Sequence, residues 1–365
     1  MRLNKNYNIL ICPLEWGLGH AARMIPMARK LLEMNHNVFI ASGEEHLLMF
    51  RKELPGLIYI PFPGFNPGYS AFLPQYIPLL LKTPLLLFHI IREHFRLKRI
   101  IGEYSVDIVI SDNRFGLWNR KIKTVYVTHI PLIPFPKPVK FLEFIGILLH
   151  RAIIRKYSFC FIPDLPGELN LSGRLSHGIK LPDTVRFIGI LSRFTPKVLS
   201  SPNDQVSFQH NTIILSGPEP QREILKQKLI TLLEDKKILT VILEGKPGKE
   251  NEVFSSDNIT FYSHLASSEM QEMISESKTI ITRAGYSTIM ELVSLNCSAL
   301  LIPTPGQTEQ EYLAEYLSAK KWFTACPQGK INEGLQLPSN AAVWPGEILE
   351  QSSILLNEAL KELLE

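Results

Sequence analysis

Residues 7–42, YNILICPLEWGLGHAARMIPMARKLLEMNHNVFIAS, decide the fold class that this sequence predicts. Tyr7–Pro13 is an apolar run of strand length, and Asn37–Ser42 is a second one. Between them, apolar residues recur at helical spacing, which predicts a helix over His20–Asn35. Strands that are apolar throughout and are joined by helices are typical of a parallel sheet with both faces covered.

The same alternation continues in two series, separated by the polar stretch Thr195–Asn211. Further strands of the first series are expected at Val106–Ser111, Thr124–Thr128, Phe159–Pro163 and Phe187–Ile190. Strands of the second series are expected at Asn211–Leu215, Leu239–Leu243, Ile259–Tyr262, Thr279–Thr282 and Ala299–Ile302. Helices of the second series are expected at Gln221–Glu234, Glu269–Ser277, Ser287–Ser294 and Thr308–Ala319. The sequence therefore predicts an α/β protein with two doubly wound, Rossmann-like domains that face each other across a cleft.

The charge is divided unevenly between the two series. Residues 1–190 carry 24 Lys and Arg against 13 Asp and Glu, a net charge of +11, and the remainder carries 15 against 22, a net charge of −7. We expect residues 1–190 and 191–345 to form domains with different partners, and a C-terminal helix in residues 346–365 to dock back across them. A random surface imbalance is the alternative.

The composition excludes several classes of protein. With 45% hydrophobic and 20% charged residues, the chain can form sizeable cores and is neither disordered nor collagen-like. Its four cysteines form no Cys-x-x-Cys pair, which favours a reducing cytoplasm over a disulfide framework. Residues 1–8 are mostly polar, so no apolar targeting segment is expected at the start of the sequence. The uncharged stretch Leu54–Leu81 carries six prolines, which argues against a membrane-spanning helix.

The loop Pro13–His20 leaves the first strand and enters a helix. Gly17 and Gly19 allow the backbone to approach a ligand, and the helix start offers free N–H groups. Gly17-x-Gly19-x-x-Ala22 also matches a dinucleotide fingerprint, so an NAD-dependent oxidoreductase remains an alternative function. The first glycine, however, lies later after the strand than a true fingerprint requires. His20 at a helix N-terminus is expected to be neutral and able to accept a proton, with capping as the alternative.

Two loops in the second half have the same placement. Thr282–Glu291 ends a strand, turns at Gly285 and begins a helix whose N–H groups suit a phosphate, with a carboxylate one turn in that suits ribose hydroxyls. Pro303–Tyr312 leaves the next strand through a Pro-Gly turn and brings amides and carboxylates together, a set suited to sugar hydroxyls. For both loops the alternative is ordinary helix capping.

Together these loops resemble glycosyltransferase family 28, in particular its UDP-N-acetylglucosamine transferases of lipid-linked muramyl peptide synthesis. The resemblance covers most of the chain and is most specific over Phe261–Leu317. The family has a Gly-rich loop with a His, an Arg-Ser-Gly segment followed by Thr-x-x-Glu, and a Gln-Gln-Tyr segment. Here the matching residues are Gly17–His20, Arg283–Glu291 and Gln310–Tyr312, with Glu311 in place of the second Gln.

The resemblance implies a GT-B architecture with the acceptor in the N-terminal domain and the nucleotide-sugar in the C-terminal domain. The expected catalytic residues are His20 as the first choice of base, with His129 and Asp112 as alternatives. The expected donor contacts are Arg193, Ser216, Gly217, His264, Arg283, Gly285, Ser287, Thr288, Glu291, Gln307, Glu309 and Gln310. The expected acceptor contacts are Gly17, Gly19, Arg23, Asn113 and Arg114. Glu291 would hold the ribose, Gln310 the donor sugar and Arg193 the diphosphate.

An apolar and basic stretch lies in the first half. Residues 76–91 are mostly apolar and are followed by Arg92, Arg96, Lys98 and Arg99, a combination that fits peripheral binding to an anionic membrane surface. Residues 141–156 extend this pattern, and a core helix with a basic end is the alternative. We expect a cytoplasmic protein, with peripheral contact to the inner face of the cell membrane through residues 72–99 as an open extension.

The expected activity is an inverting transfer of a sugar, from a UDP-sugar, to a hydroxyl acceptor that is lipid-linked at the membrane surface. No Asp-x-Asp occurs in the sequence, so no metal site and no cofactor are expected. A nucleotide-sugar 2-epimerase or hydrolase of the same fold and a non-catalytic sugar-nucleotide-binding protein remain alternatives. Nucleic-acid binding is not expected, because no basic and aromatic platform is present.

Overall fold

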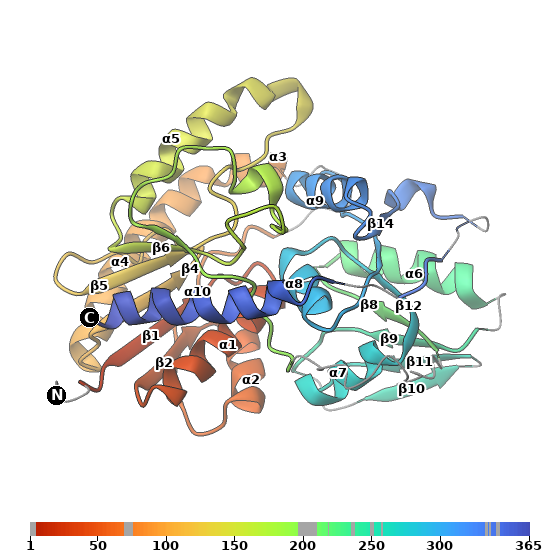
Figure 1. Cartoon of the computed structure of the whole chain (residues 1–365), viewed down its shortest axis with the longest axis horizontal. Helices are drawn as coiled ribbons and strands as arrows, with labels where there is room; N and C mark the ends of the chain where they lie inside the picture. The colour runs from red at the N-terminus through yellow and green to blue at the C-terminus, as the bar shows by residue number, and fades with distance from the viewer. Residues whose placement is uncertain are drawn as a thin grey trace.

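The computed structural model describes residues 5–68, 76–195, 210–217, 219–234, 238–248, 252–256, 258–332, 335, 337–340 and 344–365. Across these residues the chain forms two seven-stranded sheets, one in each half, with helices packed around them (Figure 1). The predicted α/β class is confirmed. Residues 196–209, most of the predicted polar stretch between the halves, lie outside the described residues, as do residues 69–75.

The N-terminal sheet is parallel throughout, with the strand order β3-β2-β1-β4-β5-β6-β7. Its strands are β1 (Asn8–Pro13), β2 (Asn37–Ser42), β3 (Ile58–Pro61), β4 (Ile108–Asp112), β5 (Lys123–Val127), β6 (Phe159–Ile162) and β7 (Val185–Phe187). Its α-helices are α1 (Leu18–Glu33), α2 (Glu44–Glu53), α3 (Tyr76–Leu81), α4 (Thr83–Glu103) and α5 (Glu143–Ile154). The chain order reverses between β1 and β4, and in sheets of this kind ligands bind beside such a switch point.

The C-terminal sheet has the order β10-β11-β9-β8-β12-β13-β14 and is parallel except for β10. Its strands are β8 (His210–Ile214), β9 (Thr240–Leu243), β10 (Val253–Ser256), β11 (Ile259–Tyr262), β12 (Ser277–Thr282), β13 (Leu300–Leu301) and β14 (Thr324–Ala325). Its α-helices are α6 (Gln221–Glu234), α7 (Ser267–Ser275), α8 (Tyr286–Ser294) and α9 (Thr308–Ala319). The switch point lies between β8 and β12, directly before the start of α8.

The last helix, α10 (Glu347–Leu364), runs back along the N-terminal domain (Figure 1). Glu362 forms a two-point ion pair with Arg186, at 2.7 and 2.6 Å. Near the helix end, Tyr7 donates from its hydroxyl to the Leu364 carbonyl, and the Lys123 ammonium donates to the Leu363 carbonyl. These contacts bring the two ends of the described chain close together. None of the helices within the described ranges has the length and apolar composition needed to cross a membrane.

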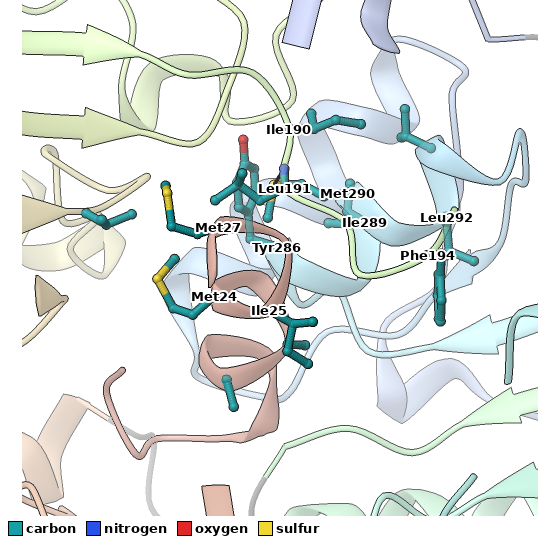
Figure 2. Close-up of a cluster of buried hydrophobic side chains, with 14 of the residues drawn as sticks. Met24, Ile25, Met27, Ile190, Leu191, Phe194, Tyr286, Ile289, Met290 and Leu292 are labelled. Atoms are coloured by element: carbon teal, nitrogen blue, oxygen red, sulfur yellow. Dashed lines mark hydrogen bonds between the residues drawn. The ribbon is translucent and has the colours of Figure 1, made fainter. Parts of the chain in front are cut away.

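The two domains share one continuous core. Figure 2 shows Met24, Ile25 and Met27 of α1 packed with residues of α8 and with the segment that joins the domains. The residues of α8 and of the joining segment that are labelled there are Ile190, Leu191, Phe194, Tyr286, Ile289, Met290 and Leu292. All are buried, and full burial of an aliphatic side chain contributes about 1.5–3 kcal/mol. The starts of α1 and α8 are therefore held against each other by apolar packing.

Candidate active site

The loop between β1 and α1 is fixed by one carboxylate. Glu15 accepts hydrogen bonds from the backbone N–H groups of Gly43 and Gly64, both at 2.8 Å. The Trp16 indole donates to the Phe65 carbonyl at 2.8 Å, and Gly17 has a φ of 143°, a backbone conformation that favours glycine. These contacts tie the loop before α1 to the segments that follow β2 and β3. Neither Glu15 nor Trp16 was assigned a role from the sequence, although both lie in the loop that the sequence singled out.

His20 and Asp112 lie side by side at this point. Nδ1 of His20 is 3.0 Å from Oδ2 of Asp112, which ends β4 and is fully buried. Arg23 donates from Nε to the same oxygen at 2.9 Å and from Nη2 to the other carboxylate oxygen. Burial alone would raise the pKa of Asp112, but the charges of Arg23 and His20 outweigh it and lower that pKa to about 2. Asp112 is therefore ionised at neutral pH.

His129, which follows β5, belongs to the same cluster. Arg23 donates from Nη1 to Nδ1 of His129 at 3.1 Å, and Nε2 of His129 lies 2.8 Å from Glu309 in the first turn of α9. The His129 ring stacks on the Tyr286 ring, with centroids 4.1 Å apart and an interplanar angle of 3°. Burial lowers the pKa of His129, which favours the neutral imidazole. All three residues expected to be catalytic are thus brought together.

The start of α8 faces the start of α1. The Ser287 hydroxyl donates to the Gly19 carbonyl at 2.8 Å, and a Cβ added at Gly19 would lie 3.1 Å from Ser287. A Cβ added at Gly285 would lie 3.9 Å from the Thr288 hydroxyl and 4.0 Å from that of Ser216, which follows β8. Five expected donor contacts, Ser216, Gly217, Gly285, Ser287 and Thr288, therefore gather around one helix N-terminus. The free N–H groups and dipole there favour an anion.

Arg193 and Glu291 were expected to bind the diphosphate and the ribose, and the structure pairs them with each other. Arg193 donates from Nε to Glu291 at 2.8 Å, and each side chain is only 7% exposed. Burial raises the pKa of Glu291, and the Arg193 charge partly offsets this rise. The pair occupies Nε of Arg193 and Oε1 of Glu291. Nearby, His264 is buried, and its Nε2 has no hydrogen-bond partner among the described residues.

Three other expected donor contacts shape the loop between β13 and α9. Arg283 is fully buried and donates to the carbonyls of Gln221, Ile302 and Pro303, and its burial lowers its pKa to about 10. Gln310 accepts the Thr304 N–H through its side-chain oxygen at 2.8 Å, and the Gln307 N–H donates to the Thr304 carbonyl. Nη1 and Nη2 of Arg283 are therefore committed to backbone carbonyls.

On the acceptor side, Asn113 and Arg114 line a small pocket between the β1–α1 loop and α4. The pocket walls are mainly apolar and include Leu14, Trp16, Phe65, Leu86, Ile90 and Phe115. Arg114 is buried, pairs with Glu93 of α4 at 2.9 Å and donates to the Phe62 carbonyl. Glu93 was missed from the sequence, although it is the only Asp or Glu in residues 54–102.

The chain has the GT-B architecture of solved glycosyltransferases: two Rossmann-like domains are joined by a shared core, and polar side chains from both meet at their facing edges. Residues 221–337 match the glycosyltransferase family 28 C-terminal domain, which confirms the resemblance to that family. Across the described residues, no group of three or more His, Cys, Asp or Glu side chains is placed to hold a metal ion.

Known proteins are similar to the chain over most of its length. An uncharacterized glycosyltransferase of Methanosarcina acetivorans is 24% identical over 314 residues, which are 81% of this chain and 79% of that protein. The spinosyn rhamnosyltransferase SpnG, solved in complex with thymidine diphosphate, has a TM-score of 0.56 at 14% identity, covering 97% of this chain and 92% of its own. MurG of Acinetobacter baumannii has a TM-score of 0.52 at 14% identity, covering 98% and 93%.

Proposed function

We propose that this glycosyltransferase moves a sugar from a nucleoside diphosphate sugar to a hydroxyl acceptor with inversion at the anomeric carbon. One observation carries the proposal. His20 directly follows Gly19, and the Ser287 hydroxyl at the start of α8 donates to the Gly19 carbonyl at 2.8 Å, so the His20–Asp112 pair lies beside the N-terminus of α8. A base on one domain and an anion site on the other then flank a single reaction point.

The hydrogen bonds distinguish the three expected bases. Asp112 is fully buried and is held by Arg23, and both ring nitrogens of His129 have partners. His20 is the most exposed of the three, with 19% of its side chain accessible, and no described residue bonds to its Nε2. We therefore assign His20 as the general base, with Asp112 orienting it through Nδ1.

The proposed reaction is a single displacement at the anomeric carbon. The acceptor hydroxyl gives its proton to Nε2 of His20, while its oxygen forms a bond to the anomeric carbon. The bond from that carbon to the diphosphate oxygen breaks, and the electron pair leaves with the nucleoside diphosphate. The imidazolium that forms is stabilised by the neighbouring Asp112 carboxylate. Attack opposite the leaving group inverts the anomeric centre.

The α8 N-terminus is the proposed site of the diphosphate. Its N–H groups at Ser287 and Thr288 lie close to the Ser216–Gly217 loop, so both segments can donate to phosphate oxygens. We propose that these fixed donors neutralise the leaving group, so that transfer does not depend on a divalent ion. The thymidine diphosphate complex of a structural neighbour supports a nucleoside diphosphate, and the family resemblance favours uridine.

We further propose that the acceptor is presented at a membrane surface. Exposed apolar side chains cover one side of α4 and α5 and the segment before α5, namely Leu85, Leu87, Phe88, Ile91, Phe95, Phe141, Phe144, Leu148 and Leu149. His94 of α4 stacks on Trp118, and Lys156, which follows the end of α5, lies over the same ring. Arg92, Lys98, Arg99 and Lys140 are exposed on the same elements. An apolar surface with cationic residues suits an anionic lipid leaflet.

Thermal shift with a panel of nucleotides tests the proposed donor. UDP-, GDP-, dTDP- and CDP-sugars are compared, with NAD as the control for a dinucleotide site at Gly17–Ala22. A ligand at about 100 times its Kd stabilises the folded state by about 2.7 kcal/mol. We expect the UDP-sugar to give the largest increase in Tm. Stabilisation by NAD alone would contradict the proposal, and release of UDP without any glycoside product would favour a hydrolase or epimerase.

A further inference from the structure

Glu309 lies on the donor-side domain but reaches the catalytic residues of the other domain. It is in the first turn of α9, and its Oε1 is 2.8 Å from Nε2 of His129. Its neighbour Thr308 donates from its hydroxyl to the Pro134 carbonyl at 2.6 Å. Further along α9, the Tyr312 hydroxyl accepts the Arg174 N–H at 2.8 Å. The first turns of α9 are thus bonded to the N-terminal domain at three points.

The hydrogen-bond chemistry at His129 defines the direction of this contact. A guanidinium can only donate, so Nδ1 of His129 accepts from Arg23 and its proton is on Nε2. Nε2 then donates to the Glu309 carboxylate, which can only accept. The same guanidinium also donates to Asp112. A continuous chain of polar contacts therefore joins Glu309 to Asp112 and, through it, to His20.

The sequence placed Glu309 among the donor contacts, and the structure gives its carboxylate a protein partner instead. Glu309 is followed directly by Gln310, the expected donor-sugar contact, whose side-chain oxygen holds the Thr304 N–H. Stacking of His129 on Tyr286, the first residue of α8, adds a second contact between His129 and the donor-side domain. Both helices whose starts would face the donor therefore touch this one imidazole.

We propose that His129 and Glu309 form a clasp between the domains that positions the donor-side helices α8 and α9 relative to His20. Both are positioning residues, and neither needs to contact the substrate. This inference rests on the proposed function, since it assumes that donor and acceptor bind on opposite sides of the clasp. Misplacing the reacting groups by about 1 Å can cost on the order of 100-fold in rate, so loss of the clasp lowers kcat.

A double-mutant cycle tests the clasp. His129→Ala, Glu309→Ala and the double variant are compared with the unmodified protein in a sugar-transfer assay with the UDP-sugar identified by thermal shift. We expect each single variant to lower kcat by about 10- to 100-fold with little change in the KM for the donor. The double variant should lose no more than the worse single variant, because the two residues act as one unit. Glu309→Gln keeps an accepting oxygen and should stay within about threefold of the unmodified protein.

Glu315→Ala is the matched control, because Glu315 is an exposed carboxylate on the same helix and should leave kcat unchanged. If the factors by which the two single variants lower kcat multiply in the double variant, the proposed clasp is wrong. It is also wrong if an increase in donor KM is confined to the Glu309 variants, which would mean that Glu309 contacts the sugar.

The same four proteins are unfolded thermally as a second cycle. Coupling between the two substitutions in Tm but not in kcat would make the pair merely structural and would also overturn the positioning role. If the unmodified protein transfers no sugar, the proposed function fails, and the Tm cycle still reports whether the two residues are coupled.

Discussion

Nδ1 of His20 lies 3.0 Å from Oδ2 of Asp112, and the Arg23 guanidinium donates to both oxygens of that carboxylate. Nη2 of Arg23 also lies 2.9 Å from Nδ1 of His20. Nδ1 can either donate to Asp112 or accept from Arg23, but it cannot do both at once. When it donates to Asp112, the basic lone pair is on Nε2, where an acceptor hydroxyl can reach it.

The first prediction concerns this pair. Replacing His20 with Ala should lower kcat by about 10²–10⁴-fold, since that is the usual contribution of a general base. Asp112→Asn should also lower kcat, because the amide no longer favours the productive tautomer. His36→Ala, a partly exposed histidine beyond the end of α1, serves as the control. Steady-state rates with saturating donor measure the effect, and turnover by His20→Ala within about threefold of the unmodified enzyme would rule out the base.

The second prediction concerns the contact between the two helix starts. A Cβ at Gly19 would lie 3.1 Å from both Cβ and Oγ of Ser287, closer than ordinary van der Waals contact. Gly19→Ala should therefore push α8 away from His20 and lower kcat, and replacing Ser287 with Gly as well should restore part of it. Gly102→Ala in α4 is the control, because a Cβ there meets no atom within 4 Å. Equal rates for all of these variants would mean that the spacing is unimportant.

A third prediction concerns the buried ion pair of Arg193 and Glu291. Removing one member leaves an unpaired buried charge, so Arg193→Ala should lower the free energy of unfolding by about 3–5 kcal/mol. Adding Glu291→Gln removes that charge and should recover part of the loss. Denaturant unfolding of the three proteins gives these values. A double variant less stable than Arg193→Ala would contradict the pairing.

The fourth prediction is a pH dependence of stability. Burial lowers the pKa of His150 to about 4, and its Nε2 is 2.9 Å from the Tyr126 hydroxyl. In the unfolded chain a histidine titrates near 6.5, so between about pH 6.5 and 4 the unfolded state binds more protons, and stability falls as the pH is lowered. His150→Gln should reduce this slope by up to one proton, or about 1.4 kcal/mol per pH unit. An unchanged slope in unfolding titrations would contradict the assignment.

The fifth prediction concerns the exposed apolar side of α4 and α5. Sedimentation with vesicles should show binding to phosphatidylglycerol-containing bilayers and little binding to pure phosphatidylcholine. Phe88→Ser together with Phe144→Ser should reduce binding, because each removes an exposed ring. Phe254→Ser, an exposed ring on β10 of the other domain, is the control. Equal binding by all proteins would contradict a membrane role for this surface.

Much of the fold could be predicted because the central strands are apolar throughout. Thr308–Ala319 is a helix with the expected bounds, and the strands around both switch points lie where the sequence placed them. The edge strands β3, β10 and β14 were missed, because they are short and largely exposed. Residues 187–190 were expected to form a strand, but β7 ends at Phe187. The apolar residues Ile188 and Ile190, which suggested a strand, instead pack in the core shared by the domains.

The candidate site could be predicted as a set of loops but not as a set of contacts. A helix start after a strand is visible in the sequence, so His20, Ser287 and Glu309 could be named. Which partner each side chain takes depends on how the domains close, and no local pattern encodes this. The ion pair of Arg193 with Glu291 and the hydrogen bond of His129 with Glu309 join residues 98 and 180 positions apart.

The position of a bound nucleotide tests the account most directly. A crystal structure with UDP should show the diphosphate against the N–H groups of Ser287 and Thr288 and against the Ser216–Gly217 loop. Nε2 of His20 should face the β-phosphate, which carries the sugar in the donor. A diphosphate held instead by Gly17–His20 would exchange the donor and acceptor sides. It would contradict the assignment of His20 as the base.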